Sequence, residues 1–279
     1  MVIEHQGQQG EQEREGQMTF ADRVVLVTGG GTGIGRALSA AFHKEGAKVA
    51  IASRDPDHLK KAAGVIATRS GHGGELIPVR VDVRVMESAK VAVSQVVEQW
   101  GRVDVLVNNA GLSARNPIDD PGSEADQKWL DIINTNVHGM YHMTRACLPC
   151  MPGGGRIINI SSVLGKFGVA GYTAYCCAKH GVVGFTRALA AEVAPRGITV
   201  NAICPGWVDT AMSERGVNEI AAAAGTTPEE FRKSANEKVP LGRFLRAEEI
   251  APLALYIASA EASAMTGQAI NIEGGATTW

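Results

Sequence analysis

Short runs of apolar and β-branched residues alternate with longer helical patterns from about residue 20 to the end of the chain. Several of the short runs are apolar almost throughout, which is typical of strands that are buried on both faces. This alternation predicts a parallel sheet covered by helices on both faces, with right-handed crossovers. The runs expected as strands are Val24–Thr28, Lys48–Ala52, Leu76–Val81, Val103–Asn108, Arg156–Ile160, Thr199–Cys204 and Ala269–Ile272.

The stretches between these runs have the ends expected of helices. Pro56 follows Asp55 and suits the first turn of a helix, where a backbone N–H is not needed. Gly46 and Gly101 fall just past predicted helix ends, where a left-handed backbone is favoured. The clearest helical patterns are Ile34–Glu45, Pro56–Arg69, Met86–Trp100 and Ala174–Ala194.

The composition is that of an ordinary globular protein. The 279 residues are 45% hydrophobic and 20% charged, with a formal net charge of −2, which provides no basic surface for nucleic acid. No apolar run is long enough to cross a bilayer. The first 18 residues are polar and lack the apolar region of a signal peptide. We therefore expect a disordered tail over residues 1–18, one domain over residues 19–279, and a cytoplasmic location.

The five cysteines are an odd number and do not indicate a disulfide framework in a chain of this size. Cys147 and Cys150 form a C-x-x-C, but no second pair and no histidines at ligand spacing accompany it. We expect reduced thiols in a reducing compartment and no metal site.

A glycine-rich turn follows the first predicted strand directly. Residues 28–35 read T-G-G-G-T-G-I-G and lead into a helical pattern. Glycines at such a turn allow close backbone approach to a pyrophosphate, and the following helix N-terminus offers free N–H groups to phosphate. A flexible turn without a ligand is the alternative, but the position between strand and helix favours a dinucleotide site. The sheet is therefore expected to be a doubly wound, Rossmann-type α/β sheet of about seven strands.

The end of the second strand bears on the choice of cofactor. NAD-binding folds usually place an acidic residue there to hold the ribose hydroxyls. Here Ser53 is neutral and Arg54 can pair with a 2′-phosphate, which favours NADP(H) over NAD(H). In the alternative interpretation, Arg54 is a solvated surface charge and Asp55 holds the ribose.

Tyr175 and Lys179 are four residues apart on a predicted helix and so share one face. A neighbouring ammonium favours the phenolate and lowers the pKa of a tyrosine from about 10. Such a phenol can exchange a proton with a ketone or alcohol oxygen. Ser162 lies thirteen positions earlier, just past a strand end, where a hydroxyl can stabilise developing alkoxide charge.

Together these motifs resemble the classical form of the short-chain dehydrogenase/reductase family over roughly residues 20–275. The resemblance implies a catalytic tetrad of Asn136, Ser162, Tyr175 and Lys179, in which the asparagine binds a water of a proton relay. Spacing selects Ser162 over Ser161, and the N-x-x-G pattern selects Asn136 over Asn134. The cofactor-binding residues that it implies are Gly29, Gly31, Thr32, Gly33, Ile34, Gly35, Ser53, Arg54, Asp82, Val83, Asn109, Ala110, Gly111, Tyr175, Lys179, Pro205, Gly206, Val208 and Thr210.

One position departs from the family pattern, because many NADP-using relatives carry a basic residue where this chain has Thr32. The family also implies a substrate lid over about residues 211–239, here two helices, Ser213–Ala224 and Pro228–Glu237. Trp207 and Met212 are candidates for the pocket wall, or they pack against neighbouring helices.

Two segments, 179–186 and 203–207, look like those of 3-hydroxybutyrate dehydrogenases and polyketide ketoreductases, and 3-oxoacyl-carrier-protein reductases are also similar. These relatives imply a 3-oxoacyl-type ketone or secondary alcohol as substrate. A basic cluster that docks the carrier protein is reduced here to Arg156, with Arg196 as a second cation, so a carrier partner is doubtful. The family further implies a homotetramer or homodimer formed by helices Asp126–Met143 and Ala174–Ala194, with another interface near Gly274–Trp279.

Three other interpretations remain. An extended epimerase or dehydratase would use a different glycine spacing. A non-catalytic NADP-binding sensor would lack a tetrad member. An NAD-dependent 3-hydroxyacid dehydrogenase would keep the whole site and differ in cofactor and direction.

Overall fold

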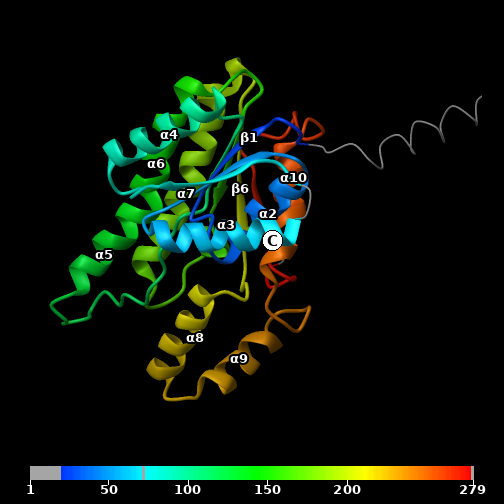
Figure 1. Cartoon of the computed structure of the whole chain (residues 1–279). Helices are drawn as coiled ribbons and strands as arrows, with labels where there is room; N and C mark the ends of the chain where they lie inside the picture. Colours follow the sequence, from blue (N-terminus) through cyan, green and yellow to red (C-terminus); the bar gives the residue numbers. More distant parts are fainter. Residues whose placement is uncertain (1–19, 71–72, 278–279) are drawn as a thin grey trace, which may run out of the picture.

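The protein is built on a sheet of seven parallel strands in the order β3-β2-β1-β4-β5-β6-β7. The computed structural model describes residues 20–70 and 73–277 (Figure 1), so the predicted tail over residues 1–18 lies outside it. The strands are β1 Val24–Thr28, β2 Lys48–Ser53, β3 Leu76–Arg80, β4 Val105–Asn108, β5 Arg156–Ile160, β6 Thr199–Pro205 and β7 Ala269–Ile272. This is the predicted Rossmann-type sheet, and the predicted strands match within two residues at each end.

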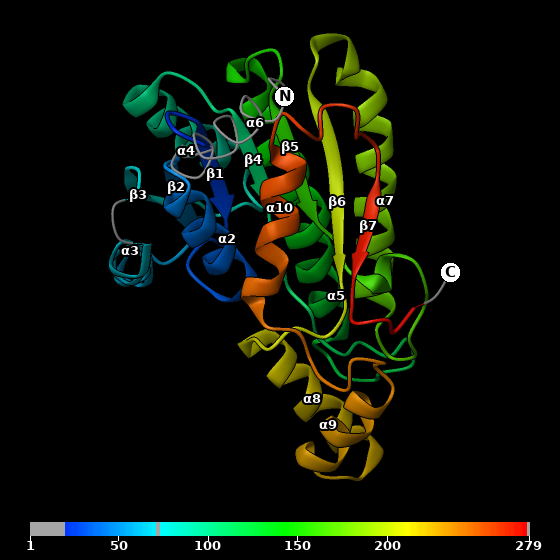
Figure 2. The same ribbon diagram turned by 90° about the vertical axis from the view of Figure 1, so that its right-hand side faces the viewer.

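Helices cover both faces of the sheet, as Figure 2 shows. The α-helices are α2 Gly33–Lys44, α3 Pro56–Ser70, α4 Met86–Trp100, α5 Ala125–Ile133, α6 Gly139–Cys147, α7 Thr173–Val193, α8 Ala211–Ala224, α9 Pro228–Glu237 and α10 Ala251–Ala258. In β1, Val25 and Val27 belong to the core under α2, α3 and α10, whereas Val24 and Leu26 belong to the core under α4, α6 and α7. Each fully buried side chain of this kind contributes roughly 1.5–3 kcal/mol.

The predicted helix ends agree with the backbone. Gly46 and Gly101 have φ angles of 86° and 81°, in the left-handed region. The Oδ1 of Asp55 accepts hydrogen bonds from the backbone N–H groups of Asp57 and His58, both at 3.0 Å, and so caps α3. Strand β4 begins at Val105, two residues after its predicted start; just before it, the side chain of Asp104 accepts the backbone N–H of Val24 at 2.8 Å.

The single helix predicted over Asp126–Met143 is wrong in one respect. The structure divides it into α5, a π-helical turn η1 over Asn134–His138, and α6. Asn136 lies within this turn, and its side-chain Nδ2 donates a hydrogen bond to the backbone oxygen of Ile132, just before the turn, at 2.8 Å. Widened turns of this type occur frequently at functional sites.

Helices α8 and α9 extend beyond the carboxyl ends of the strands (Figures 1 and 2). Thr210 caps α8 and Thr227 caps α9, each by accepting a backbone N–H three residues on. Gly225 ends α8 with a φ of 67°. These bounds agree with the two helices predicted for the lid, although α8 begins two residues early because its cap is Thr210.

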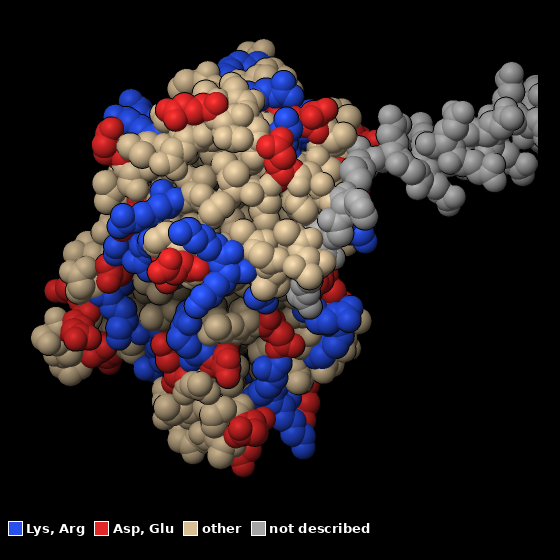
Figure 3. Space-filling view, in the orientation of Figure 1, with Lys and Arg blue, Asp and Glu red and all other residues tan. Residues whose placement is uncertain are grey.

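Acidic and basic side chains are interspersed over the face drawn in Figure 3. Within residues 20–70 and 73–277, no helix is long and apolar enough to span a membrane. The same residues contain no group of three or more His, Cys, Asp or Glu side chains that could hold a metal ion.

Candidate active site

The predicted site residues gather at the carboxyl edge of the sheet, where β1 has β2 on one side and β4 on the other. Crossovers leave in opposite directions at this point, and open α/β sheets bind ligands in the resulting crevice. The glycine turn follows β1, the segment 109–111 follows β4, Ser162 follows β5, and the segment 205–210 ends β6 and leads into α8.

The glycine turn has a backbone that other residues could not adopt. Gly29 and Gly33 have φ angles of 64° and 46°. A Cβ on Gly35 would overlap the backbone oxygen of Gly29 and the amide of Asn109. That amide donates to the backbone oxygen of Thr28 at 2.9 Å, so Asn109 ties the turn after β1 to the end of β4.

The N-terminus of α2 is suited to an anion. Its cap residue, Thr32, makes no side-chain capping hydrogen bond, and the first turn carries no acidic residue. The first N–H groups of a helix therefore point outward with the positive end of the helix dipole. A Cβ on Gly33 would lie 3.1 Å from Thr210 Cγ2, so the segment 205–210 closes over this turn. This arrangement can hold the pyrophosphate of a dinucleotide.

The two charged residues at the end of β2 that could select the cofactor differ in whether their side chains are already engaged within the fold. Asp55 is committed to the cap of α3, and hydrogen bonds from His58 and Asp57 lower the pKa of its carboxyl group. Arg54 is exposed. This geometry supports Arg54, rather than Asp55, as the residue that meets the ribose of a cofactor.

Asp82 and Arg84 form a two-pronged ion pair beside this position. The Nη2 of Arg84 lies 2.7 Å from Oδ2 of Asp82, and its Nε lies 3.0 Å from Oδ1. Hydrogen bonding to Arg84 lowers the pKa of Asp82, with a further contribution from the charge of Arg54. The carboxylate of this predicted cofactor-binding residue is thus shared with an arginine that lies outside the predicted motifs.

Lys179 is buried beneath the tyrosine ring. Its Nζ donates to the backbone oxygen of Ile160 at 2.8 Å and lies 5.5 Å from the centroid of the Tyr175 ring. Burial lowers the pKa of Lys179 to about 8. Burial also raises the pKa of Tyr175 to about 12, opposed by a hydrogen bond with Ser162. The expected depression of the tyrosine pKa is therefore wrong for the chain by itself, because burial outweighs the hydrogen bond with Ser162.

The two serines after β5 have different tasks. Ser161 donates its hydroxyl to the backbone oxygen of Lys179 at 3.0 Å and so holds α7 against β5. Ser162 accepts the backbone N–H of Leu164 at 3.1 Å, which leaves its hydroxyl hydrogen free to donate. The hydroxyl of Ser162 is the one beside Tyr175, as the spacing predicts.

Asn136 is buried and bridges η1 to the segment after β4. Its Nδ2 donates to the backbone oxygens of Leu112 and Ile132, both at 2.8 Å, and its Oδ1 accepts the N–H of Leu112 at 3.2 Å. A Cβ on Gly111 would lie 2.8 Å from Asn136 Oδ1 and 3.6 Å from Lys179 Nζ. Gly111 therefore leaves space between the asparagine and the lysine, which is what a water-mediated relay requires.

The β6 end and the lid share an aromatic cluster. Trp207 stacks on Phe244 with ring centroids 4.9 Å apart and meets Phe231 edge-on at 6.2 Å. Much of the Trp207 ring therefore packs against neighbouring side chains, which was the alternative to a place in the pocket wall. The residue is nevertheless only partly buried. Phe244 gave no signal in the sequence, because its partner is far away along the chain.

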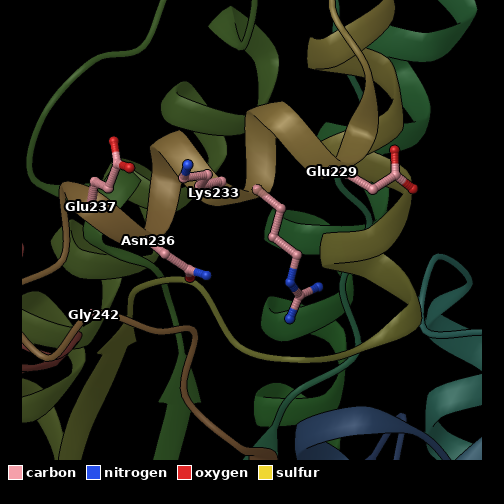
Figure 4. A pocket seen from close by; sticks show the side chains of 6 residues that line it. Glu229, Lys233, Asn236, Glu237 and Gly242 are labelled. Atoms are coloured by element: carbon pink, nitrogen blue, oxygen red, sulfur yellow. The ribbon is translucent and has the colours of Figure 1, made fainter.

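A surface hollow of about 510 Å³ lies along α9 and not over the tetrad. Figure 4 shows it lined by α9 and Gly242. Its side chains carry charges of both signs, from Glu229, Arg232, Lys233 and Glu237. Among the described residues, a proton donor, a hydrogen-bond donor and a dinucleotide turn come together at the tetrad, which is therefore the candidate active site.

This fold and site define a nucleotide-binding oxidoreductase. A family model described as enoyl-(acyl carrier protein) reductase matches residues 29–277. A protein of Streptomyces virginiae, named as a ketoacyl reductase of the monensin polyketide synthase, is 43% identical over 259 residues, 91% of this chain and 96% of its own. The 3-oxoacyl-(acyl-carrier-protein) reductase of Thermotoga maritima is 37% identical and covers 92% of this chain and 99% of its own.

Solved structures agree. A substituted actinorhodin polyketide ketoreductase with NADPH has a TM-score of 0.86 at 37% identity, covering 92% of this chain and 98% of its own. A short-chain type dehydrogenase/reductase from Mycobacterium marinum has a TM-score of 0.82 at 32% identity, covering 94% and 98%. The chain belongs to the short-chain dehydrogenase/reductase family. The predicted family, fold class and oxidoreductase activity are confirmed.

Proposed function

We propose that this chain reduces a 3-oxoacyl-type ketone to the corresponding secondary alcohol with NADPH. The observation that carries the proposal is the meeting of Ser162, Tyr175 and Lys179 at the carboxyl edge of the sheet, beside the glycine turn. Support for the substrate class comes from relatives named as ketoacyl and 3-oxoacyl reductases. Exposed Arg54 beside neutral Ser53 supports NADPH.

The tetrad provides the proton chemistry of this reaction. The glycine turn and the segment 205–210 would hold a nicotinamide cofactor, which would supply the hydride for the carbonyl carbon. Ser162 donates a hydrogen bond to the carbonyl oxygen, and Tyr175 transfers its phenolic proton to that oxygen as negative charge develops. Lys179 stabilises the resulting phenolate, and the space beside Gly111 connects Lys179 with Asn136 for the return of a proton. The raised pKa of Tyr175 keeps the phenol protonated before the reaction.

A free substrate is favoured over a carrier-bound one. The guanidinium of buried Arg156 donates to the backbone oxygens of Ser259 and Gly154. Arg196 donates to the backbone oxygens of Leu148 and Met151 at 2.9 and 2.8 Å. Both cations thus hold loops in place, so we expect a small-molecule thioester or ester as substrate. A cytoplasmic location is part of the proposal, and the five free cysteines support it.

The test is NADPH consumption by the purified chain with a 3-oxoacyl thioester, a cyclic ketone, an aryl ketone and an enoyl thioester. We expect turnover with the 3-oxoacyl thioester and none with the enoyl thioester, because Ser162 and Tyr175 converge on an oxygen. Consumption with the enoyl thioester alone, or with no member of the panel, would overturn the proposal.

Tyr175→Phe tests the proton donor. The variant is expected to fold and to bind NADPH, measured by fluorescence titration, yet to lose nearly all turnover because no other side chain donates the proton. Retention of more than a few per cent of the wild-type rate would contradict this assignment.

A further inference from the structure

A second buried phenol lies one helical turn before the catalytic tyrosine. Tyr172 is the residue that caps α7, and only 6% of its surface is exposed. Its hydroxyl has no hydrogen-bond partner among the described residues. Buried tyrosine hydroxyls usually have a partner, and an unpaired one is destabilising. The tetrad mechanism does not use this group.

The hydroxyl of Tyr172 points toward the lid. A Cβ on Gly216 of α8 would lie 3.7 Å from that hydroxyl and 3.8 Å from Cζ3 of Trp207. Three groups therefore face one space between α7 and α8: the phenol, the aromatic edge of Trp207, and a backbone without a side chain. Trp207 lies between Gly206 and Val208, two of the predicted cofactor-binding residues, so this space adjoins the predicted cofactor site.

The charged groups around Tyr172 favour a neutral phenol. Burial raises the pKa of Tyr172 to about 12, the carboxylate of Glu219 acts in the same direction, and Arg115 opposes it. Glu219 makes no hydrogen bond with the phenol, and its Oε2 accepts the backbone N–H of Arg115 at 2.8 Å. The guanidinium of Arg115 lies against Gly171. Tyr172 is thus a hydrogen-bond donor without an acceptor.

We propose that Tyr172 donates a hydrogen bond to a second oxygen of the substrate, beyond the carbonyl held by Ser162 and Tyr175. Residues three apart near a helix start lie on one side of it, so both phenols can reach one short molecule. The substrates favoured are carbonyl compounds with another acceptor oxygen nearby, such as 3-oxoesters and 3-oxothioesters. The inference rests on the proposed function and assigns to it a residue that determines specificity.

Tyr172→Phe tests this on the full chain with NADPH and two ketones of similar size, ethyl acetoacetate and 2-hexanone. The wild type should prefer the ester. In the variant, KM for the ester should rise about tenfold with kcat little changed, whereas both constants for 2-hexanone should stay the same. Tyr256→Phe is the matched control, because this tyrosine is 48% exposed on α10, and it should change nothing. Thermal unfolding and NADPH titration verify the fold of each variant.

The outcomes separate the two levels of inference. A wild type that reduces neither ketone contradicts the proposed function and, with it, the role of Tyr172. A wild type that is active but reduces 2-hexanone as well as the ester overturns only the role of Tyr172. The same holds if Tyr172→Phe leaves KM for the ester unchanged, or if it impairs both ketones equally, since equal loss indicates a structural role.

Discussion

Cofactor choice depends on three neighbouring side chains at the end of β2. Ser53 cannot repel a 2′-phosphate, Arg54 can pair with it, and Asp55 is engaged in capping α3. We expect kcat/KM for NADPH to exceed that for NADH by about tenfold to a hundredfold, the effect of one charge-assisted contact. Arg54→Ala should remove most of this difference by weakening NADPH use, with little effect on NADH.

Ser53→Asp should go further and reverse the preference, because the added carboxylate accepts ribose hydroxyls and repels phosphate. Steady-state kinetics with both cofactors measure each ratio, and Lys233→Ala, on the outer lid, is the control. Equal use of both cofactors by the wild type, or an unchanged ratio in Arg54→Ala, would favour the account in which Asp55 holds the ribose.

Lys179 makes stability depend on pH in a defined window. Its pKa is about 8 in the fold, compared with the usual 10.5, because burial disfavours the charged form. Between these values the unfolded chain binds more protons, so stability rises with pH. Relative to Lys179→Met, the wild type should gain about 2–3 kcal/mol between pH 8 and pH 10. Urea unfolding of both proteins at the two pH values measures their free energies of unfolding. If the stability of the wild type relative to Lys179→Met stays constant or falls as the pH rises, a buried lysine with a low pKa is refuted.

At the residue scale, the sequence predicted which side chains come together but not their pKa values or their hydrogen-bond partners. The spacing of Ser162, Tyr175 and Lys179 was sufficient because helix and strand geometry bring these positions together. The raised pKa of Tyr175 was not predictable, because it depends on how deeply the folded chain buries the phenol. The unpaired hydroxyl of Tyr172 was missed for the same reason.

At the element scale, the glycine turn is the part of the site least tolerant of change. Gly35→Ala would place a methyl group against the backbone oxygen of Gly29 and the amide of Asn109. We expect NADPH binding to weaken at least tenfold and the melting temperature to fall, because the turn must shift away from the pyrophosphate position. Gly64→Ala is the matched control, since a Cβ there meets nothing within 4 Å.

The control variant Gly64→Ala is itself expected to change the stability of the chain. Gly64 lies inside α3, and alanine there should stabilise the chain by about 0.5–1 kcal/mol because it reduces the freedom of the unfolded state. Calorimetry and cofactor titration measure both variants. Similar cofactor affinity in the two would show that the tight approach at Gly35 is not needed.

The sequence was most informative about elements with a strong hydrophobic pattern. Strands β1, β5 and β7 agree with their predicted bounds, because buried strands read as short apolar runs between turn signals. The π-helical turn η1 was not predictable, since one added residue in a helix barely changes its apolar pattern. The stacking of Trp207 on Phe244 joins segments distant along the chain, and local patterns do not encode such contacts.

At the scale of the whole molecule, the described surface leaves apolar side chains exposed on the helices that the family resemblance assigns to assembly. Leu130 of α5 is 49% exposed and Tyr141 of α6 is 42% exposed. We expect a homodimer or homotetramer with this face at a two-fold axis, where each residue is used twice and a single charge is therefore introduced twice.

Leu130→Glu should shift the assembly toward smaller species, because it buries two carboxylates without partners. Val65→Glu is the control, since Val65 is 44% exposed on α3, away from this face, and should leave the mass unchanged. Light scattering at micromolar concentration measures each mass. A monomeric wild type would exclude the assembly, and an unchanged mass in Leu130→Glu would move the interface to another face.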